Sequence, residues 1–176
     1  MRTRLGFLVL TVALFAAPAL RAQAQPTEGV RFGLGGGLLV PLGTYGTSDK
    51  IGANILGMVQ MPIANSPIHL RLAGMYGTTS HEVGSGSTQI LGGTADLLYH
   101  VGVRSAPVRP YVVGGLGFFN VKNGASQSKL GLGLGGGLLF GIGNMHAFLE
   151  ARYMSIQTSG PNMRFVPITL GLMFRS

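Results

Sequence analysis

The sequence contains no cysteine among its 176 residues, so no disulfide can hold the fold together. Charged residues are also scarce, at 10% of the chain, whereas about a quarter is typical of a soluble domain. The charges that are present are scattered and form no basic run, which disfavours nucleic acid as a partner. The chain must therefore be held together by a core, by lipid or by closure of a sheet.

Long apolar runs are missing after the first part of the chain. The one such run, residues 5–17, follows Arg2 and Arg4 and precedes Ala22-Gln23-Ala24, a small-x-small cleavage pattern. We expect residues 1–24 to be a cleaved signal peptide and residues 25–176 to form one domain. An uncleaved helical anchor is the alternative, but Pro18 interrupts the run and a spanning helix takes about 20 apolar residues.

The last stretch of the chain, residues 164–175, alternates between large apolar and mixed side chains. The apolar positions are Val166, Ile168, Leu170, Leu172 and Phe174. A period of two indicates a strand with one apolar face, and about ten tilted residues cross a bilayer. A strand in lipid needs a closed barrel, because an open edge leaves backbone N–H and C=O groups unpaired in hydrocarbon.

Eight segments share this pattern, and their connections alternate in length. We predict strands over residues 30–40, 51–61, 68–78, 89–101, 110–121, 130–141, 146–156 and 164–174. Polar connections over residues 41–50, 79–88, 122–129 and 157–163 alternate with turns over 63–67, 102–109 and 142–145. Long outer loops and short periplasmic turns are typical of outer-membrane barrels. The predicted fold is an all-β, eight-stranded antiparallel up-and-down transmembrane β-barrel behind a signal peptide.

Glycine is abundant, with 30 residues. Each one costs about 1 kcal/mol relative to alanine inside a helix, which argues against helices here. The fragment Gly-Leu-Gly-Gly-Gly-Leu-Leu occurs at residues 33–39 and again at 133–139. In both copies the strand pattern turns the odd-numbered glycines inward, where they leave space for larger side chains. A nucleotide-binding loop is disfavoured, because the Lys-Ser/Thr pair and the later acidic residue are missing.

Aromatic side chains on the outward face are predicted to form two interfacial girdles. Phe32, Tyr99, Tyr111, Phe140 and Phe174 fall at the periplasmic end, and Tyr76, Phe119 and Tyr153 fall at the outer end. Such girdles are typical of a barrel in lipid. A soluble periplasmic lipocalin-like barrel is an alternative that matches the strand number but not the girdles.

Polar side chains occupy the opposite, inward face. A charge facing lipid near the midplane costs about 2–4 kcal/mol for Arg or Lys, and an unpaired buried charge is also costly. We therefore expect a lumenal polar network in which Asp96 and Glu150 pair with Arg71 and Arg152, near His69, His100 and His146. Structural pairing explains these groups, so no catalytic, cofactor-binding or metal site is expected. Zinc or copper on the three imidazoles is an alternative without a clustered motif.

The polar triplet Ser80-His81-Glu82 lies in the second long connection. A lipid-modifying barrel enzyme would carry a Ser/His/acid set at its outer rim. Adjacent loop residues seldom point at one another, so a solvated loop is the favoured interpretation and an enzyme is the alternative.

Several short motifs resemble a known family. These are residues 149–153 (Leu-Glu-Ala-Arg-Tyr), residues 109–111 (Arg-Pro-Tyr) followed by 114–118 (Gly-Gly-Leu-Gly-Phe), and residues 167–174 (Pro-Ile-Thr-Leu-Gly-Leu-Met-Phe). They are similar to the small eight-stranded outer-membrane β-barrels of the OmpA and OmpX type. The resemblance implies an integral outer-membrane location, lipid and lipopolysaccharide as neighbours, and recognition of Leu170, Leu172 and Phe174 by the barrel-assembly machinery. In that family the chain usually ends on the aromatic residue, whereas Arg175 and Ser176 follow here.

The expected function is non-enzymatic, either structural in the envelope or in surface display and adhesion. Host or surface ligands would bind the long loops at residues 80–87 and 122–129. Eight strands enclose an interior just wide enough for side chains, which disfavours a diffusion porin. A narrow channel, or a carrier for an apolar ligand bound by inward Leu39, Met58, Met75, Phe148 and Met154, is the main alternative.

Overall fold

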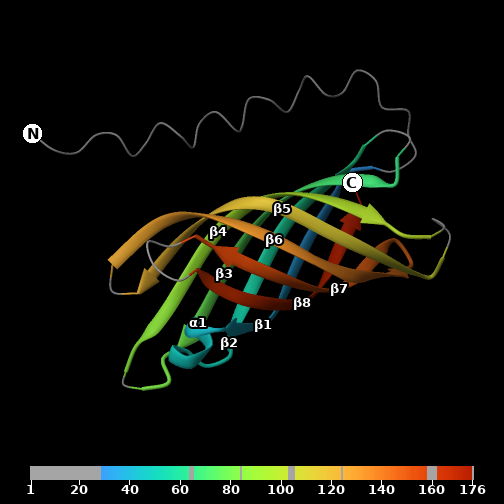
Figure 1. Cartoon of the computed structure of the whole chain (residues 1–176). Coiled ribbons are helices and arrows are strands. Elements are labelled where there is room, and N and C mark those ends of the chain that lie inside the picture. Colours follow the sequence, from blue (N-terminus) through green and yellow to red (C-terminus); the bar gives the residue numbers. More distant parts are fainter. Residues whose placement is uncertain are drawn as a thin grey trace, which may run out of the picture.

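Eight strands form a closed barrel in which each strand pairs with its sequence neighbours. The computed structural model describes residues 29–63, 66–83, 85–102, 106–123, 125–157 and 162–175, so the expected signal peptide lies outside it. The strands are β1 (Arg31–Leu42), β2 (Gly52–Pro62), β3 (Ile68–Ser80), β4 (Ser87–His100), β5 (Val108–Asn123), β6 (Ala125–Ile142), β7 (Met145–Ile156) and β8 (Met163–Arg175), with one short helix, α1 (Thr44–Ser48) (Figure 1).

The barrel closes where the first strand meets the last. β1 and β8 run antiparallel in a register from Arg31 opposite Arg175 to Leu42 opposite Arg164. The other seven neighbouring pairs are antiparallel too. The predicted eight-stranded antiparallel up-and-down barrel is therefore confirmed. No helix within the described residues is long and apolar enough to cross a membrane.

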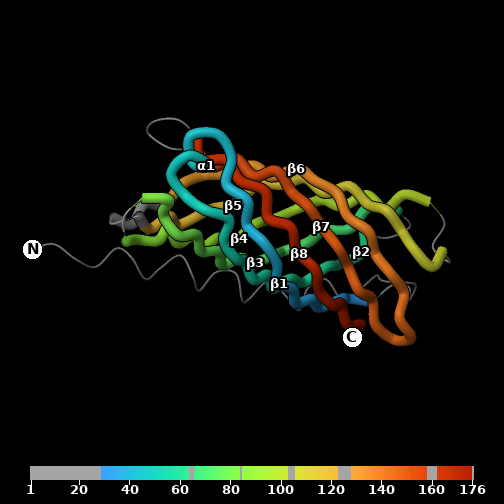
Figure 2. Tube along the Cα trace, turned by 90° about the horizontal axis from the view of Figure 1, so that it is seen from below, coloured from blue at the N-terminus to red at the C-terminus, as the bar shows by residue number. Residues whose placement is uncertain are grey.

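Two predicted loops contain regular structure. The prediction of a long connection over residues 122–129 is wrong, because β5 continues to Asn123 and β6 begins at Ala125. Lys122 is paired with Ser126 in this hairpin. Its residues are polar, so the apolar alternation stops although the backbone ladder continues. The connection over residues 41–50 contains α1, which lies at the end of the barrel opposite the C-terminus (Figure 2).

The two faces of each strand differ sharply in burial. Leu170 on β8 is 61% exposed, whereas Phe165 on the same strand is completely buried. The outward positions of β8 are apolar, as the alternation predicts, and they form part of the band that meets lipid. The core inside the barrel combines aliphatic residues, methionines and aromatic rings, including Leu39, Met58, Met75, Phe148 and Met154.

Two members of the predicted aromatic girdles face the interior instead. Phe32, Tyr76, Tyr99, Tyr153 and Phe174 are exposed, and Phe140 is half-buried. The prediction was wrong for Tyr111 and Phe119, which are 5% and 1% exposed. Both faces of this part of β5 are apolar, so the alternation does not define which face points inward.

Neighbouring residues explain the orientation of β5. Phe118 is 70% exposed and takes the outward place instead of Phe119. The ring of Phe119 occupies space left by Gly92, Gly117 and Gly131, since a Cβ atom at any of them would lie against it. The inward position of Tyr111 brings its hydroxyl to the carboxylate of Glu150.

Inward and outward glycines are expected to respond differently to substitution. A Cβ atom at Gly37 would overlap the carbonyl oxygen of Ile168, whereas one at Gly74 would meet nothing within 4 Å. We expect Gly37→Ala to destabilise the barrel by about 1–3 kcal/mol or more through overpacking, and Gly74→Ala to be neutral or stabilising by a few tenths of a kcal/mol. Urea titration of the folded band on unheated gels measures both. Equal loss in the two variants would contradict the inward assignment.

Candidate functional site

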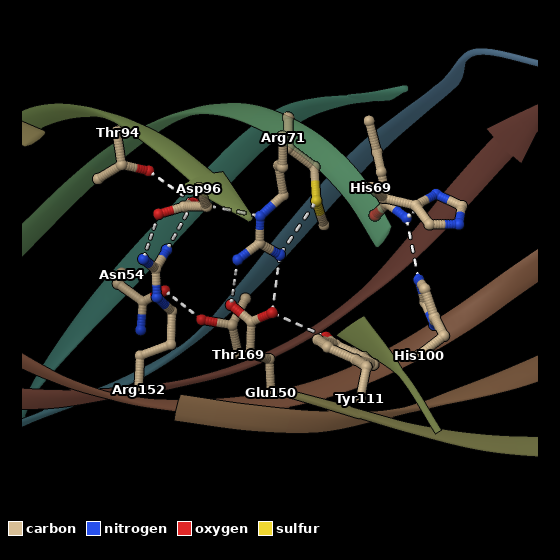
Figure 3. A network of polar contacts seen from close by, with 12 residues as sticks. Asn54, His69, Arg71, Thr94, Asp96, His100, Tyr111, Glu150, Arg152 and Thr169 are labelled. Atoms are coloured by element: carbon tan, nitrogen blue, oxygen red, sulfur yellow. Dashed lines mark hydrogen bonds and ion pairs between the residues drawn. The ribbon is translucent and has the colours of Figure 1, made fainter. Parts of the chain in front are cut away.

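Two arginines and two carboxylates meet inside the barrel. Arg71 on β3, Asp96 on β4, and Glu150 and Arg152 on β7 are each no more than 5% exposed (Figure 3). Arg71 contacts Glu150 through Nη1–Oε2 at 2.7 Å and Nη2–Oε1 at 3.0 Å. Arg152 contacts Asp96 through Nη2–Oδ1 at 2.6 Å and Nη1–Oδ2 at 3.1 Å. Both pairs are bidentate, because two N–H groups of each planar guanidinium donate to the two oxygens of one carboxylate.

One further contact joins the two pairs, and neutral donors complete them. Arg71 Nε donates to Asp96 Oδ2 at 3.3 Å. The Tyr111 hydroxyl donates to Glu150 Oε2 at 2.7 Å, and the Thr94 hydroxyl donates to Asp96 Oδ2 at 2.9 Å. The lumenal network, defined as Arg71, Asp96, Glu150 and Arg152, therefore has no net charge. Its contacts link β3, β4 and β7 across the interior of the barrel.

Glycines on the neighbouring strands make room for this network. Asp96 is opposite Gly115, Glu150 is opposite Gly137, and Arg152 is opposite Gly135. A Cβ atom at Gly115 would overlap the Asp96 carboxylate, and one at Gly135 would press against Arg152. The Gly-Leu-Gly-Gly-Gly repeat in β6 thus gives space to charged side chains. The copy in β1 instead gives space to Met58 and Phe148.

A second polar cluster lies between the lumenal network and the periplasmic end of the barrel. Gln60 Nε2 lies 3.0 Å from His69 Nδ1 and 3.2 Å from His100 Nε2. The two imidazoles meet edge to face, with ring centroids 4.5 Å apart. His146, at the start of β7, is half-buried and stands opposite Gly141 and Met173. No group of three or more His, Asp or Glu side chains with metal-binding placement occurs among the described residues.

A third set of polar contacts lies at the outer end of the barrel. The Tyr45 hydroxyl of α1 lies 2.7 Å from Thr79 Oγ1, and the Thr79 hydroxyl donates to Asp49 Oδ1 at 2.8 Å. Burial is the main cause that raises the pKa of Tyr45 to about 12. The hydrogen bond with Thr79 lowers this pKa, and the negative charge of Asp49 raises it. Tyr45 also packs against the core cluster. Its ring thus lies over the outer end of the packed interior.

The triplet Ser80-His81-Glu82 does not form a catalytic relay. His81 Nε2 faces both Asp49 Oδ1, at 3.9 Å, and Thr88 Oγ1, at 3.4 Å. A Ser–His–acid relay needs the acid on one ring nitrogen and the nucleophile on the other. Ser80 and Glu82 are exposed, and the backbone N–H of Glu82 donates to Ser48 O at 2.9 Å. The triplet therefore joins two outer connections.

The interior near the lumenal network leaves little open space. An internal cavity of about 20 Å³ lies between Glu150, Arg152, Phe119 and Thr169. This is about the space that one water molecule needs. Apolar residues that could have lined a carrier site, such as Leu39 and Phe148, are fully buried in packed contacts.

Some site residues have no signal in the sequence. Strand parity places the charged residues inward, but Gln60 and Tyr111 stand out only when the register brings them to His69 and Glu150. Tyr45 and Asp49 belong to a connection with no apolar period. No local pattern links them to Thr79, which is 30 or more positions away.

Comparison with known proteins agrees with this architecture. The model of the family described as outer membrane protein beta-barrel domain matches residues 7–175. No curated protein sequence matches the chain. Among solved structures, Neisserial surface protein A superposes with a TM-score of 0.67 at 18% identity, over 86% of this chain and 100% of that one.

Two other solved barrels are similar in fold. The outer membrane enzyme PagL has a TM-score of 0.55 at 13% identity, covering 83% of this chain and 99% of that one. The attachment invasion locus protein Ail of Yersinia pestis, solved with the heparin analogue sucrose octasulfate, has a TM-score of 0.53 at 19% identity, covering 85% of this chain and 100% of that one. With the closed barrel and its apolar outer band, the match over nearly all of the chain shows that this protein belongs to the outer membrane protein beta-barrel domain family and is integral to the outer membrane.

Proposed function

We propose that the protein is a non-enzymatic outer-membrane protein that acts through its outer surface rather than through its lumen. The observation that carries this proposal is the lumenal network, whose two-pronged ion pairs cross the barrel between β3, β4 and β7. Tyr45 packs against the core at the outer end and contacts Thr79. An ion entering the barrel would have to displace buried charge pairs, which is costly.

The outer surface offers a place for a ligand. A hollow of about 330 Å³ lies between α1 and the β3–β4 connection, lined by Thr47, Ser48, Asp49, His81, Glu82 and Val83. The two connections are held together by Lys50 N–H donating to Ser80 O at 2.8 Å. The complex of Ail with a heparin analogue supports surface binding as a role for a barrel of this fold. An exposed surface formed by connecting segments suits adhesion or display.

An enzymatic role has less support. PagL shows that an outer membrane enzyme can share this fold, and fold alone does not decide function. The one histidine described at the outer rim, His81, presents the same ring nitrogen to its carboxylate and hydroxyl neighbours. In a Ser–His–acid triad the acid holds the second ring nitrogen and so keeps the required tautomer.

Assembly and lipid contacts follow from the outward face of β8. Leu170, Leu172 and Phe174 are exposed on this strand, which closes the barrel against β1. We infer that these residues are the signal read by the barrel-assembly machinery. The apolar band beside them would face phospholipid and lipopolysaccharide chains after insertion.

Conductance in planar bilayers tests the closed lumen. We expect the purified protein to insert without step-like conductance, while a general porin measured in the same bilayer shows clear steps. Regular steps from the wild-type protein would refute the surface role and favour the narrow channel.

A cell-adhesion assay tests the proposed binding role of the outer surface separately from the lumen. We expect the triple variant T47A/E82A/V83A to lose adhesion of expressing cells to a target surface, since all three side chains border the outer hollow. Asn144→Ala in the periplasmic β6–β7 turn is the matched control, because it is exposed at the opposite end. Equal adhesion of both variants would exclude this hollow as the binding surface.

A further inference from the structure

A hollow of about 940 Å³ crosses the lipid-facing wall of the barrel from β1 to β6. Its floor is formed by three outward glycines in one row across neighbouring strands, Gly57 on β2, Gly74 on β3 and Gly93 on β4. Leu34 on β1 and Phe118 on β5 continue the row on either side, and both of these side chains are exposed. We call this hollow the glycine groove.

The packing of the barrel does not require glycine at the three floor positions. A Cβ atom would meet nothing within 4 Å at Gly74, and its nearest neighbour would be 3.6 Å away at Gly57 and 3.8 Å away at Gly93. Inward glycines differ, because a Cβ atom at Gly37 or Gly115 would overlap atoms of the neighbouring strand. The lack of side chains on the floor therefore provides space on the lipid side of the wall.

The glycine groove lies in the outer half of the apolar band. Tyr76 and Leu91 form the next row toward the outer end. A second hollow, of about 440 Å³, shares two of the floor glycines and extends to this row. The following row pairs Thr78 with Gln89, so the apolar surface ends there. Toward the periplasm the apolar outward positions continue over residues 68–72 of β3. The groove is therefore at the level of the outer leaflet.

A positive charge lies on the same wall, just beyond the apolar band. Lys122 on β5 is exposed and stands opposite Gln89 in register. It shares the outward face of Phe118, because the two positions differ by an even number of residues. A lysine at this level of a membrane attracts the phosphate groups of lipid heads. An apolar groove beside an outer cation matches an amphiphile that has acyl chains and a phosphorylated head.

We propose that the glycine groove binds one acyl chain of lipopolysaccharide and that Lys122 contacts a phosphate of its headgroup. Lipopolysaccharide occupies the outer leaflet of an outer membrane, at the level of the groove, whereas phospholipid occupies the periplasmic leaflet. Inside lipid, association depends on van der Waals packing, and a sunken glycine floor increases the contact of a chain with the wall. Binding of this kind depends on the outer-membrane location and not on adhesion through the outer hollow.

A second copy of the barrel fits the groove less well than a lipid chain does. The side chains of Leu34 and Phe118 project on either side of the glycine floor. The wall of another barrel is also convex, so it would contact these side chains before it reached the floor. A single flexible chain can lie between them.

Native mass spectrometry of the refolded barrel, titrated with purified lipid A, tests the groove. We expect a complex of one barrel with one lipid A molecule. Gly74→Leu should weaken this binding by about tenfold or more, because the new side chain fills the groove. Ala151→Leu, on the outward face of β7 and away from both hollows, is the matched control and should leave binding within about twofold. Heat-dependent gel migration shows that each variant folds, and Gly93→Leu serves if Gly74→Leu does not.

The headgroup contact has its own pair of variants. Lys122→Gln should weaken lipid A binding by about fivefold, and this loss should shrink at high salt because salt screens an exposed charge pair. Arg164→Gln is the control, since Arg164 is an exposed cation at the outer end of β8 and away from the groove. Equal losses in the two variants would overturn the contact at Lys122.

Three results of the titration would overturn the site or its occupant. Unchanged affinity in Gly74→Leu would exclude the groove as the site. A phosphatidylethanolamine that binds as tightly as lipid A would overturn lipopolysaccharide as the occupant. A dimer of barrels that disappears in Gly74→Leu would make a second copy the occupant. Loss of adhesion in T47A/E82A/V83A is a separate outcome, because none of these three residues lines the groove.

Discussion

Replacing Glu150 with Gln is expected to lower the free energy of unfolding by about 3–5 kcal/mol. The substitution leaves Arg71 buried beside Asp96 with one full negative charge to share between two guanidinium groups. It also weakens the acceptor of the Tyr111 hydroxyl. Urea titration of the folded gel band, or loss of the β-sheet circular dichroism signal, measures the change.

Glu82→Gln is the matched control for this prediction, because Glu82 is exposed at the outer end. It should change stability by no more than about 0.5 kcal/mol. The double variant R71Q/E150Q should cost less than the sum of its two single variants, since removing both partners leaves no unpaired charge. Equal stability of Glu150→Gln and Glu82→Gln would show that the lumenal network contributes nothing to folding.

Replacing Phe119 with Ala is expected to destabilise the barrel by about 3–5 kcal/mol, whereas the same change at Phe118 should cost far less. The Phe119 ring is buried against Gly92, Gly117 and Gly131. Glycines have no side chains that could move into the space left by the ring, so the cavity would persist. Phe118 points outward, where lipid fills the space after truncation.

The adjacent phenylalanines provide their own control, because both variants have the same composition and lie on the same strand. Urea titration of the two proteins in the same detergent compares them directly. A larger loss for Phe118→Ala than for Phe119→Ala would restore the outward orientation that the sequence pattern suggests for Phe119.

Strand positions could be predicted from the sequence because lipid requires apolar side chains at every second, outward-facing position of a strand. β8 illustrates this, since Leu170 and Leu172 alternate with residues that face the core. The rule fails where both faces are apolar, as in the part of β5 that carries Phe118 and Phe119. It also fails beyond the membrane, where the β5–β6 hairpin pairs polar residues such as Lys122 and Ser126.

The residues of the lumenal network could be predicted from the same alternation, but their pairing could not. Alternation places Arg71 and Glu150 on inward faces, but it does not specify which charges meet. Arg71 contacts Glu150 across 79 sequence positions, and Arg152 contacts Asp96 across 56. These partners depend on the tilt and register of the closed barrel, which strand patterns do not encode. The link from Tyr45 through Thr79 to Asp49 depends in the same way on the placement of α1.

The long sequence separation of these ion pairs has a consequence for how the protein folds. Contacts between distant segments form only after a large loss of chain entropy, which slows folding. Until β3, β4 and β7 have assembled, Arg71, Asp96, Glu150 and Arg152 lack their partners, and hydrocarbon would not tolerate them. Bare hydrocarbon would therefore not tolerate a partly assembled sheet. We expect insertion to be coupled to closure, which is completed when β1 meets β8.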